Sequence, residues 1–61
     1  MKKAVEDIRK LRIEKKATQA EASAFCGVPL RTWEAWERGL SQPPQYTINL
    51  IYEKLLTIRQ E

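Results

Sequence analysis

The sequence predicts an all-α fold, a compact arrangement of four helices. Apolar side chains recur at helical spacing, and no segment alternates apolar and polar residues for long enough to suggest a strand. The chain has 61 residues, enough for one core, so we expect a single domain over residues 1–61. The residues that most often interrupt helices are few, and they divide the chain into helical segments: Gly27, Pro29, Gly39, Pro43 and Pro44.

The first helix is expected from about Lys3 to Lys16. Acidic residues stand in its opening turn and lysines at its end, which matches the helix dipole at both termini. One face should turn inward and carries, at helical spacing, Val5, Ile8, Leu11 and Arg12.

The second helix is expected to begin after Thr18. Thr18 and Glu21 have the spacing of a capping box, in which each side chain accepts a hydrogen bond from the other residue's backbone N–H. Gly27 can end the helix by taking the left-handed conformation. Only Gly27 and Val28 separate this helix from Pro29, and so short a linker predicts a sharp turn between two helices. The alanines of this helix would let the next helix approach closely.

The third helix is expected over about Leu30 to Arg38, between Pro29 and Gly39. At 100° per residue the side chains divide into two sets. The inward set is Trp33, Trp36 and Glu37, and the opposite set is Arg31, Glu34, Ala35 and Arg38. We expect both tryptophans to pack in the core rather than to form an exposed stacking surface.

The fourth helix is expected to follow Pro44 and to run roughly from Gln45 to Gln60. Its apolar residues cover more than one face, and a monomer of this size would leave several of them in water. We therefore predict a homodimer interface made by Ile48, Tyr52, Leu55 and Leu56. The alternative is that the end of this helix bends back over the first helix.

Composition excludes several classes of function. Cys26 is the sole cysteine and there is no histidine, so an internal disulfide, a Cys/His metal site and histidine catalysis are all excluded. We expect no enzyme, no cofactor, no metal and no small-molecule ligand. No apolar stretch is long enough for a membrane span and no secretory signal is recognisable, so we expect no membrane partner and a cytoplasmic protein.

Positive charge is concentrated in the first two-thirds of the chain. The net charge is +3; residues 1–40 hold nine Lys/Arg against six Asp/Glu, and the last 21 residues hold two of each sign. A polyanion would bind this region, although many solvated surfaces carry a similar surplus.

The segment TQAEASAFCGVPLRTWEAWERG, from Thr18 to Gly39, resembles the helix-turn-helix of the phage repressor and Cro family, also called the XRE family. Arg12 before it and Pro43 with Pro44 after it also match the family pattern. The resemblance implies a lambda-repressor-like domain, with the helix-turn-helix formed by the second and third helices. It also implies an ion pair between Arg12 and Glu37.

The resemblance further implies binding to double-stranded DNA, with the third helix in the major groove. The positions that match base-contacting residues of the family are Leu30, Arg31, Thr32 and Ala35. The positions that match phosphate-contacting residues are Thr18, Gln19, Arg38 and Ser41. Without the resemblance, Arg31 is equally well explained as a solvated helix residue, and Glu34 is left unassigned.

The function that follows is a sequence-specific transcriptional regulator, a dimeric repressor that occupies an operator. The alternative is a protein-interaction module, an antitoxin-like adaptor whose basic face meets an acidic protein, because one fold can serve both functions.

Overall fold

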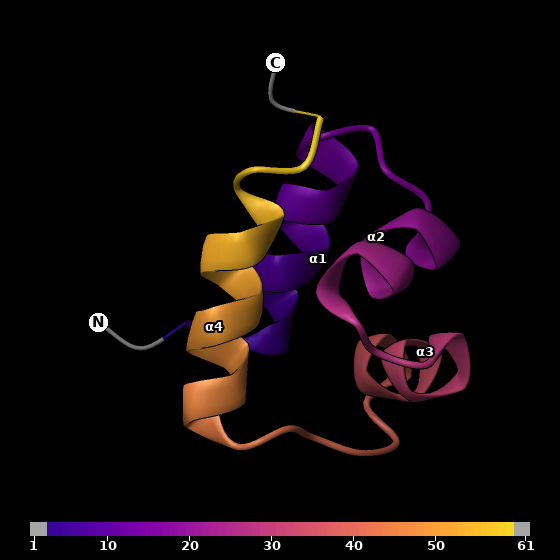
Figure 1. Cartoon of the computed structure of the whole chain (residues 1–61). Helices are drawn as coiled ribbons and strands as arrows, with labels where there is room; N and C mark the ends of the chain where they lie inside the picture. The colour runs from indigo at the N-terminus through magenta and orange to yellow at the C-terminus, as the bar shows by residue number, and fades with distance from the viewer. Residues whose placement is uncertain (1–2, 60–61) are drawn as a thin grey trace.

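Four helices make up the computed structural model, which describes residues 3–59 (Figure 1). They are α1 (Val5–Glu14), α2 (Gln19–Cys26), α3 (Leu30–Arg38) and α4 (Gln45–Leu55). No strand occurs within the described range, so the all-α prediction is confirmed there. The two residues at each end of the predicted domain lie outside the described part. The fold is compact, with a Cα radius of gyration of 10.4 Å.

Helices α1 and α4 lie side by side and run in the same direction, while α2 and α3 lie together on one side of this pair (Figure 1). Hydrogen bonds join the chain near the starts of α1 and α4 and near the ends of the same two helices. Gln45 Nε2 donates to the carbonyl of Lys3 at 2.8 Å, and Arg59 Nη2 donates to the carbonyl of Lys16 at 3.2 Å. The α1–α4 pair therefore forms a base against which α2 and α3 are held.

A single core lies between the helices. Trp33 of α3 is its largest side chain and is 1% exposed, so the inward direction predicted for this tryptophan is confirmed. Ala22 of α2 is fully buried, as expected if small side chains let neighbouring helices approach closely. The apolar core consists of Ile8, Leu11, Ala17, Ala22, Trp33, Ile48, Ile51, Leu55 and Ile58.

The start and end of α2 have the local structure that the sequence predicts. Glu21 N–H donates to Thr18 Oγ1 at 3.0 Å and Thr18 N–H donates to Glu21 Oε1 at 2.9 Å, which completes the capping box. Gly27 ends α2 with φ 74°, and Gly39 ends α3 with φ 81°. The predicted range of the third helix agrees with α3.

The outer helices are shorter than the sequence predicts. α1 ends at Glu14, and Lys16 takes a positive φ of 59° that turns the chain toward α2. α4 ends at Leu55, and residues 56–59 form turns that return Ile58 to the core, where it is 7% exposed. The predicted end of the fourth helix at Gln60 lies outside the described residues.

The predicted dimer interface is wrong at two positions. Ile48 is 2% exposed and Leu55 is fully buried, because both side chains of α4 pack within the core of their own chain. They are not available to a second copy. Tyr52 is half-buried and Leu56 is 42% exposed, so neither is excluded by burial.

Across residues 3–59, no helix combines the length and the apolar character needed to cross a membrane.

Candidate nucleic-acid interface

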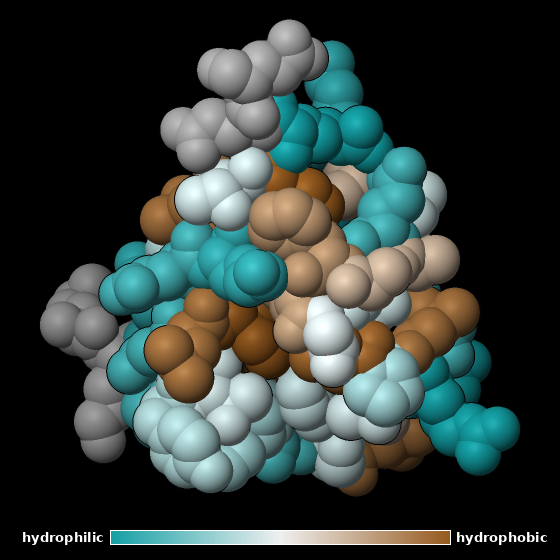
Figure 2. All heavy atoms as spheres, in the orientation of Figure 1, coloured by the Kyte–Doolittle hydropathy of each residue, from teal (hydrophilic) through white to brown (hydrophobic). Residues whose placement is uncertain are grey.

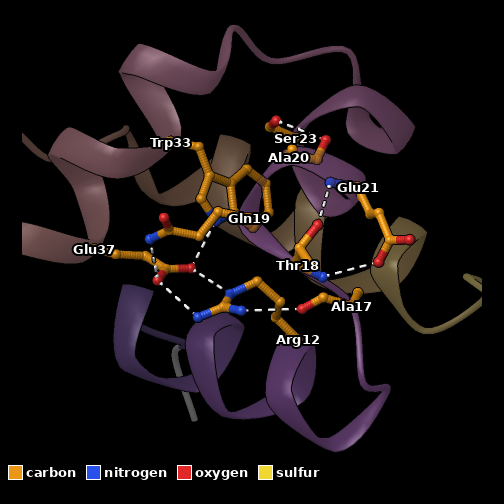
Figure 3. Close-up of polar contacts among 9 residues, drawn as sticks. All are labelled: Arg12, Ala17, Thr18, Gln19, Ala20, Glu21, Ser23, Trp33 and Glu37. Carbon is orange, nitrogen blue, oxygen red and sulfur yellow. Dashed lines mark hydrogen bonds and ion pairs between the residues drawn. The ribbon is translucent and has the colours of Figure 1, made fainter.

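The carboxylate of Glu37, near the end of α3, receives hydrogen bonds from three other side chains (Figure 3). Arg12 of α1 binds it through two nitrogens, with Nε to Oε2 at 2.8 Å and Nη2 to Oε1 at 3.1 Å. Gln19 at the start of α2 donates from Nε2 to Oε1 at 2.9 Å, and the Trp33 indole N–H donates to Oε2 at 2.6 Å. The ion pair that the sequence predicts between Arg12 and Glu37 is therefore present, within a larger network.

This network is well shielded from water. The side chains of Arg12 and Glu37 are 14% and 5% exposed. Burial of the Glu37 carboxylate raises its pKa, but the hydrogen bonds from Arg12, Gln19 and Trp33 and the charge of Arg12 lower it by more, so the net pKa is below the ordinary value. The carboxylate is therefore ionised at neutral pH, and the bidentate geometry is the strongest that arginine offers.

The Glu37 network fixes the positions of three helices. Arg12 lies on α1, Gln19 on α2, and Glu37 with Trp33 on α3, so one carboxylate joins all three. Arg12 Nη1 also donates to the carbonyl of Ala17 at 3.0 Å, which ties the α1–α2 turn to the same point. The start of α2 and the outer face of α3 are consequently held in one fixed relation.

The start of α2 offers backbone donors. The capping box satisfies the N–H of Glu21, while within residues 3–59 no hydrogen bond is recorded from the N–H of Gln19 or Ala20. Thr18 is exposed and Gln19 half-buried. The Gln19 amide carries two N–H bonds and uses one on Glu37, so the other can still donate. Free N–H groups at a helix start favour an anion.

The residues that the resemblance assigns to bases lie on α3 and differ in their exposure. Arg31 is exposed and Leu30 is 40% exposed, while Thr32 and Ala35 are half-buried. Among residues 3–59, Arg31 forms no ion pair and no hydrogen bond from its side chain. The residues assigned to phosphates at the end of α3 and beyond it, Arg38 and Ser41, are both exposed.

Sequence reasoning missed two participants in the Glu37 network. Trp33 was expected only to pack, yet its indole N–H binds Glu37, and the four-residue spacing within one helix was the available signal. Gln19 was expected to face a phosphate, but its amide also binds inward to Glu37. No sequence signal points to this second contact, because it joins different helices.

The described residues offer little for other chemistry. No group of three or more His, Cys, Asp or Glu in residues 3–59 is placed to hold a metal ion. Burial raises the pKa of the Cys26 thiol more than the charge of Lys54 lowers it, so the thiol is not activated as a nucleophile.

Comparison of the chain with protein-family models, curated proteins and solved structures found no match.

Proposed function

We propose that the protein is a sequence-specific DNA-binding regulator in which α2, the turn at Gly27 and α3 act as a helix-turn-helix of the lambda-repressor type. In this proposal α3 enters the major groove and the start of α2 binds the DNA backbone. A repressor that occupies its operator as a dimer is the simplest form of such a regulator, and its place of action is the cytoplasm.

The Glu37 network is the observation that carries the proposal. It holds the α2 start and α3 against α1 through one buried carboxylate, while Arg31 on the outer face of α3 has no intramolecular partner among the described residues. A recognition helix must hold its side chains within about 0.5 Å of the positions that base contacts require, and such rigid support supplies that precision.

The proposed contacts divide into two kinds. Arg31 reads a base, because a guanidinium can bind guanine O6 and N7 together, with Leu30, Thr32 and Ala35 beside it. Backbone contacts position the protein without reading sequence, and they come from Thr18, Gln19, Arg38 and Ser41. The Thr32 hydroxyl and the Leu30 side chain suit a base edge and a thymine methyl group respectively.

Selection of bound sequences from a random duplex pool, followed by fluorescence anisotropy, tests the proposal. We expect one enriched sequence and a steep loss of affinity with rising salt. The Arg31→Ala variant should lose discrimination at one base pair by roughly 1–3 kcal/mol. The Arg38→Ala variant should weaken all duplexes alike and retain the preference.

Lys10→Ala is the matched control, since Lys10 is an exposed cation on α1 outside these contacts. If the pool yields no enriched sequence and duplex binding is as weak as that of an unrelated basic protein, the DNA-binding proposal is wrong. The adaptor alternative would then be the one to pursue, with an acidic protein as the expected partner.

A further inference from the structure

A groove of about 300 Å³ lies between the start of α1 and the end of α3, outside the contacts proposed above for the bases. In Figure 1 the start of α1 faces the end of α3, where the chain leaves toward α4. The side chains that matter in this groove are Glu6 and Arg9 of α1, Trp36 and Arg38 of α3, and Ser41 and Gln42 of the following loop.

Two arginines line the groove from different helices. Arg9 and Arg38 are both exposed. The ion pairs among residues 3–59 join Arg12 to Glu37 and Arg59 to Glu21, so neither arginine of the groove takes part in one. The Ser41 hydroxyl and the Gln42 amide add hydrogen-bond donors from the loop.

We propose that this groove binds a backbone phosphate of the DNA, which makes Arg9 of α1 a phosphate contact together with Arg38 of α3. The inference rests on the proposed function and extends its interface onto α1. Guanidinium groups match the geometry of phosphate oxygens, and two of them beside hydroxyl and amide donors form a site for a phosphodiester rather than for a base.

The groove is already shaped before DNA binds. Arg38 follows Glu37 directly on α3, and Arg9 lies one turn from Arg12 on α1. The Arg12–Glu37 pair therefore holds the two walls at a fixed separation. Preorganisation of this kind lowers the entropy that binding would otherwise cost.

Two carboxylates line the groove. The charge of Glu37 is paired with Arg12, whereas Glu6 is exposed, lies on the same wall as Arg9 and forms no ion pair among residues 3–59. A phosphate in the groove would be repelled by the charge of Glu6, so the substitution Glu6→Gln should tighten binding to every duplex.

The salt dependence of duplex binding tests whether Arg9 contacts a phosphate. With a fluorescein-labelled duplex carrying the selected sequence, Arg9→Ala should reduce the slope of log K against log salt by about 0.9, the value for one phosphate contact. Arg9→Ala should also weaken all single-base variants of the duplex equally. Lys10→Ala removes the same charge one residue away, outside the groove, and should leave the slope unchanged.

A second pair of variants tests the groove itself. Glu6→Gln should raise affinity several-fold at 0.15 M salt, where screening extends over about 8 Å. Glu14→Gln, an exposed control about 12 Å further along α1, should change it little. The inference is overturned if Arg9→Ala matches Lys10→Ala or if Glu6→Gln matches Glu14→Gln while the wild-type protein still selects a sequence. Absence of duplex binding by the wild type would instead remove the proposed function and this inference together.

Discussion

At the scale of single residues, the carboxylate of Glu37 is the most consequential group in the chain. It accepts four hydrogen bonds from Arg12, Gln19 and Trp33 while its side chain is only 5% exposed. Removing one partner of a buried pair leaves an uncompensated charge, so the cost exceeds the net value of the pair. Substitution of Arg12, the cation paired with this carboxylate, should therefore destabilise the fold strongly.

Arg12→Met should lower the free energy of unfolding by about 3–5 kcal/mol, because the Glu37 charge would stay buried without its cation. A core of this size supplies only about 3–5 kcal/mol in total. Circular dichroism should therefore show a largely unfolded variant at 25 °C. Arg59→Met is the control, since the side chains of the Arg59–Glu21 pair are 45% and 50% exposed, and solvent screening should make its loss far less destabilising. Equal melting temperatures for Arg12→Met and the wild type would contradict the buried-pair argument.

The same carboxylate makes stability depend on pH. The pKa of Glu37 in the folded protein lies below its unfolded value of about 4.3. The Glu37 carboxylate therefore makes its full contribution to the free energy of unfolding at pH values above the unfolded pKa. The contribution is lost as pH falls through the folded pKa. Urea unfolding from pH 7 to pH 2.5 should show a difference between wild type and Glu37→Gln that shrinks at the acid end.

Glu21 does not confuse this comparison of wild type with Glu37→Gln. A hydrogen bond from the Thr18 N–H and the contact with Arg59 lower the pKa of Glu21 as well, but this carboxylate is present in both proteins. A difference that stays constant over the whole pH range would show that Glu37 keeps its ordinary pKa in the folded protein.

At the scale of helices, local signals predicted α2 and α3 closely. A capping box at Thr18 and left-handed glycines at 27 and 39 act within one turn, so the sequence contains them directly. The ends of α1 and α4 escaped prediction because no glycine or proline marks them. Lys16 and Arg59 take positive φ without being glycine, and contacts between distant segments accompany both turns.

The candidate site divides in the same way. The Arg12–Glu37 pair and the outer face of α3 were predictable from the resemblance and from helical spacing. The roles of Gln19 in the network and of Arg9 in the groove were not, because both depend on which side chains of separate helices meet. Burial of Ile48 and Leu55 was missed because apolar spacing alone cannot say which of two faces is covered.

The turn between α2 and α3 permits a clean test at this scale. Gly27 has φ 74°, and a Cβ added there would meet no atom within 4 Å, so a substitution introduces backbone strain and no clash. Gly27→Ala should cost about 1–2 kcal/mol in urea unfolding. Gly27→Asn should cost less, because asparagine tolerates the left-handed region better. If the alanine variant is as stable as the wild type, the turn has another conformation in solution.

At the scale of the whole molecule, the chain presents apolar side chains that its single core does not cover. Figure 2 shows brown side chains scattered over one face of the molecule. The large hydrophobic side chains of α4 that are exposed are Tyr46, at 68%, and Leu50, at 65%, which lie one turn apart. A small core gains stability from self-association, and an isologous dimer would cover the same face of both copies. Because Ile48 and Leu55 are buried, we now predict that the dimer contact includes Tyr46 and Leu50 in their place.

A two-fold dimer of this kind would present two α3 helices to one duplex. In Figure 1 α4 and α3 lie on opposite sides, so a contact through α4 leaves α3 uncovered in both copies. Two-fold dimers of helix-turn-helix domains bind half-sites about 34 Å apart. A palindromic operator is the matching DNA.

The double variant Tyr46→Glu/Leu50→Glu should remain folded, since both side chains are exposed, and it should sediment as a monomer. Its affinity for the full operator should fall far more than its affinity for a single half-site, because only the full site gains from joining two copies. Ile13→Glu, at a 50% exposed position on α1, adds the same kind of charge elsewhere and should leave the dimer intact. A wild-type protein that sediments as a monomer at high micromolar concentration would exclude the dimer. A dimer that survives the double variant would place the contact on another face, away from α4.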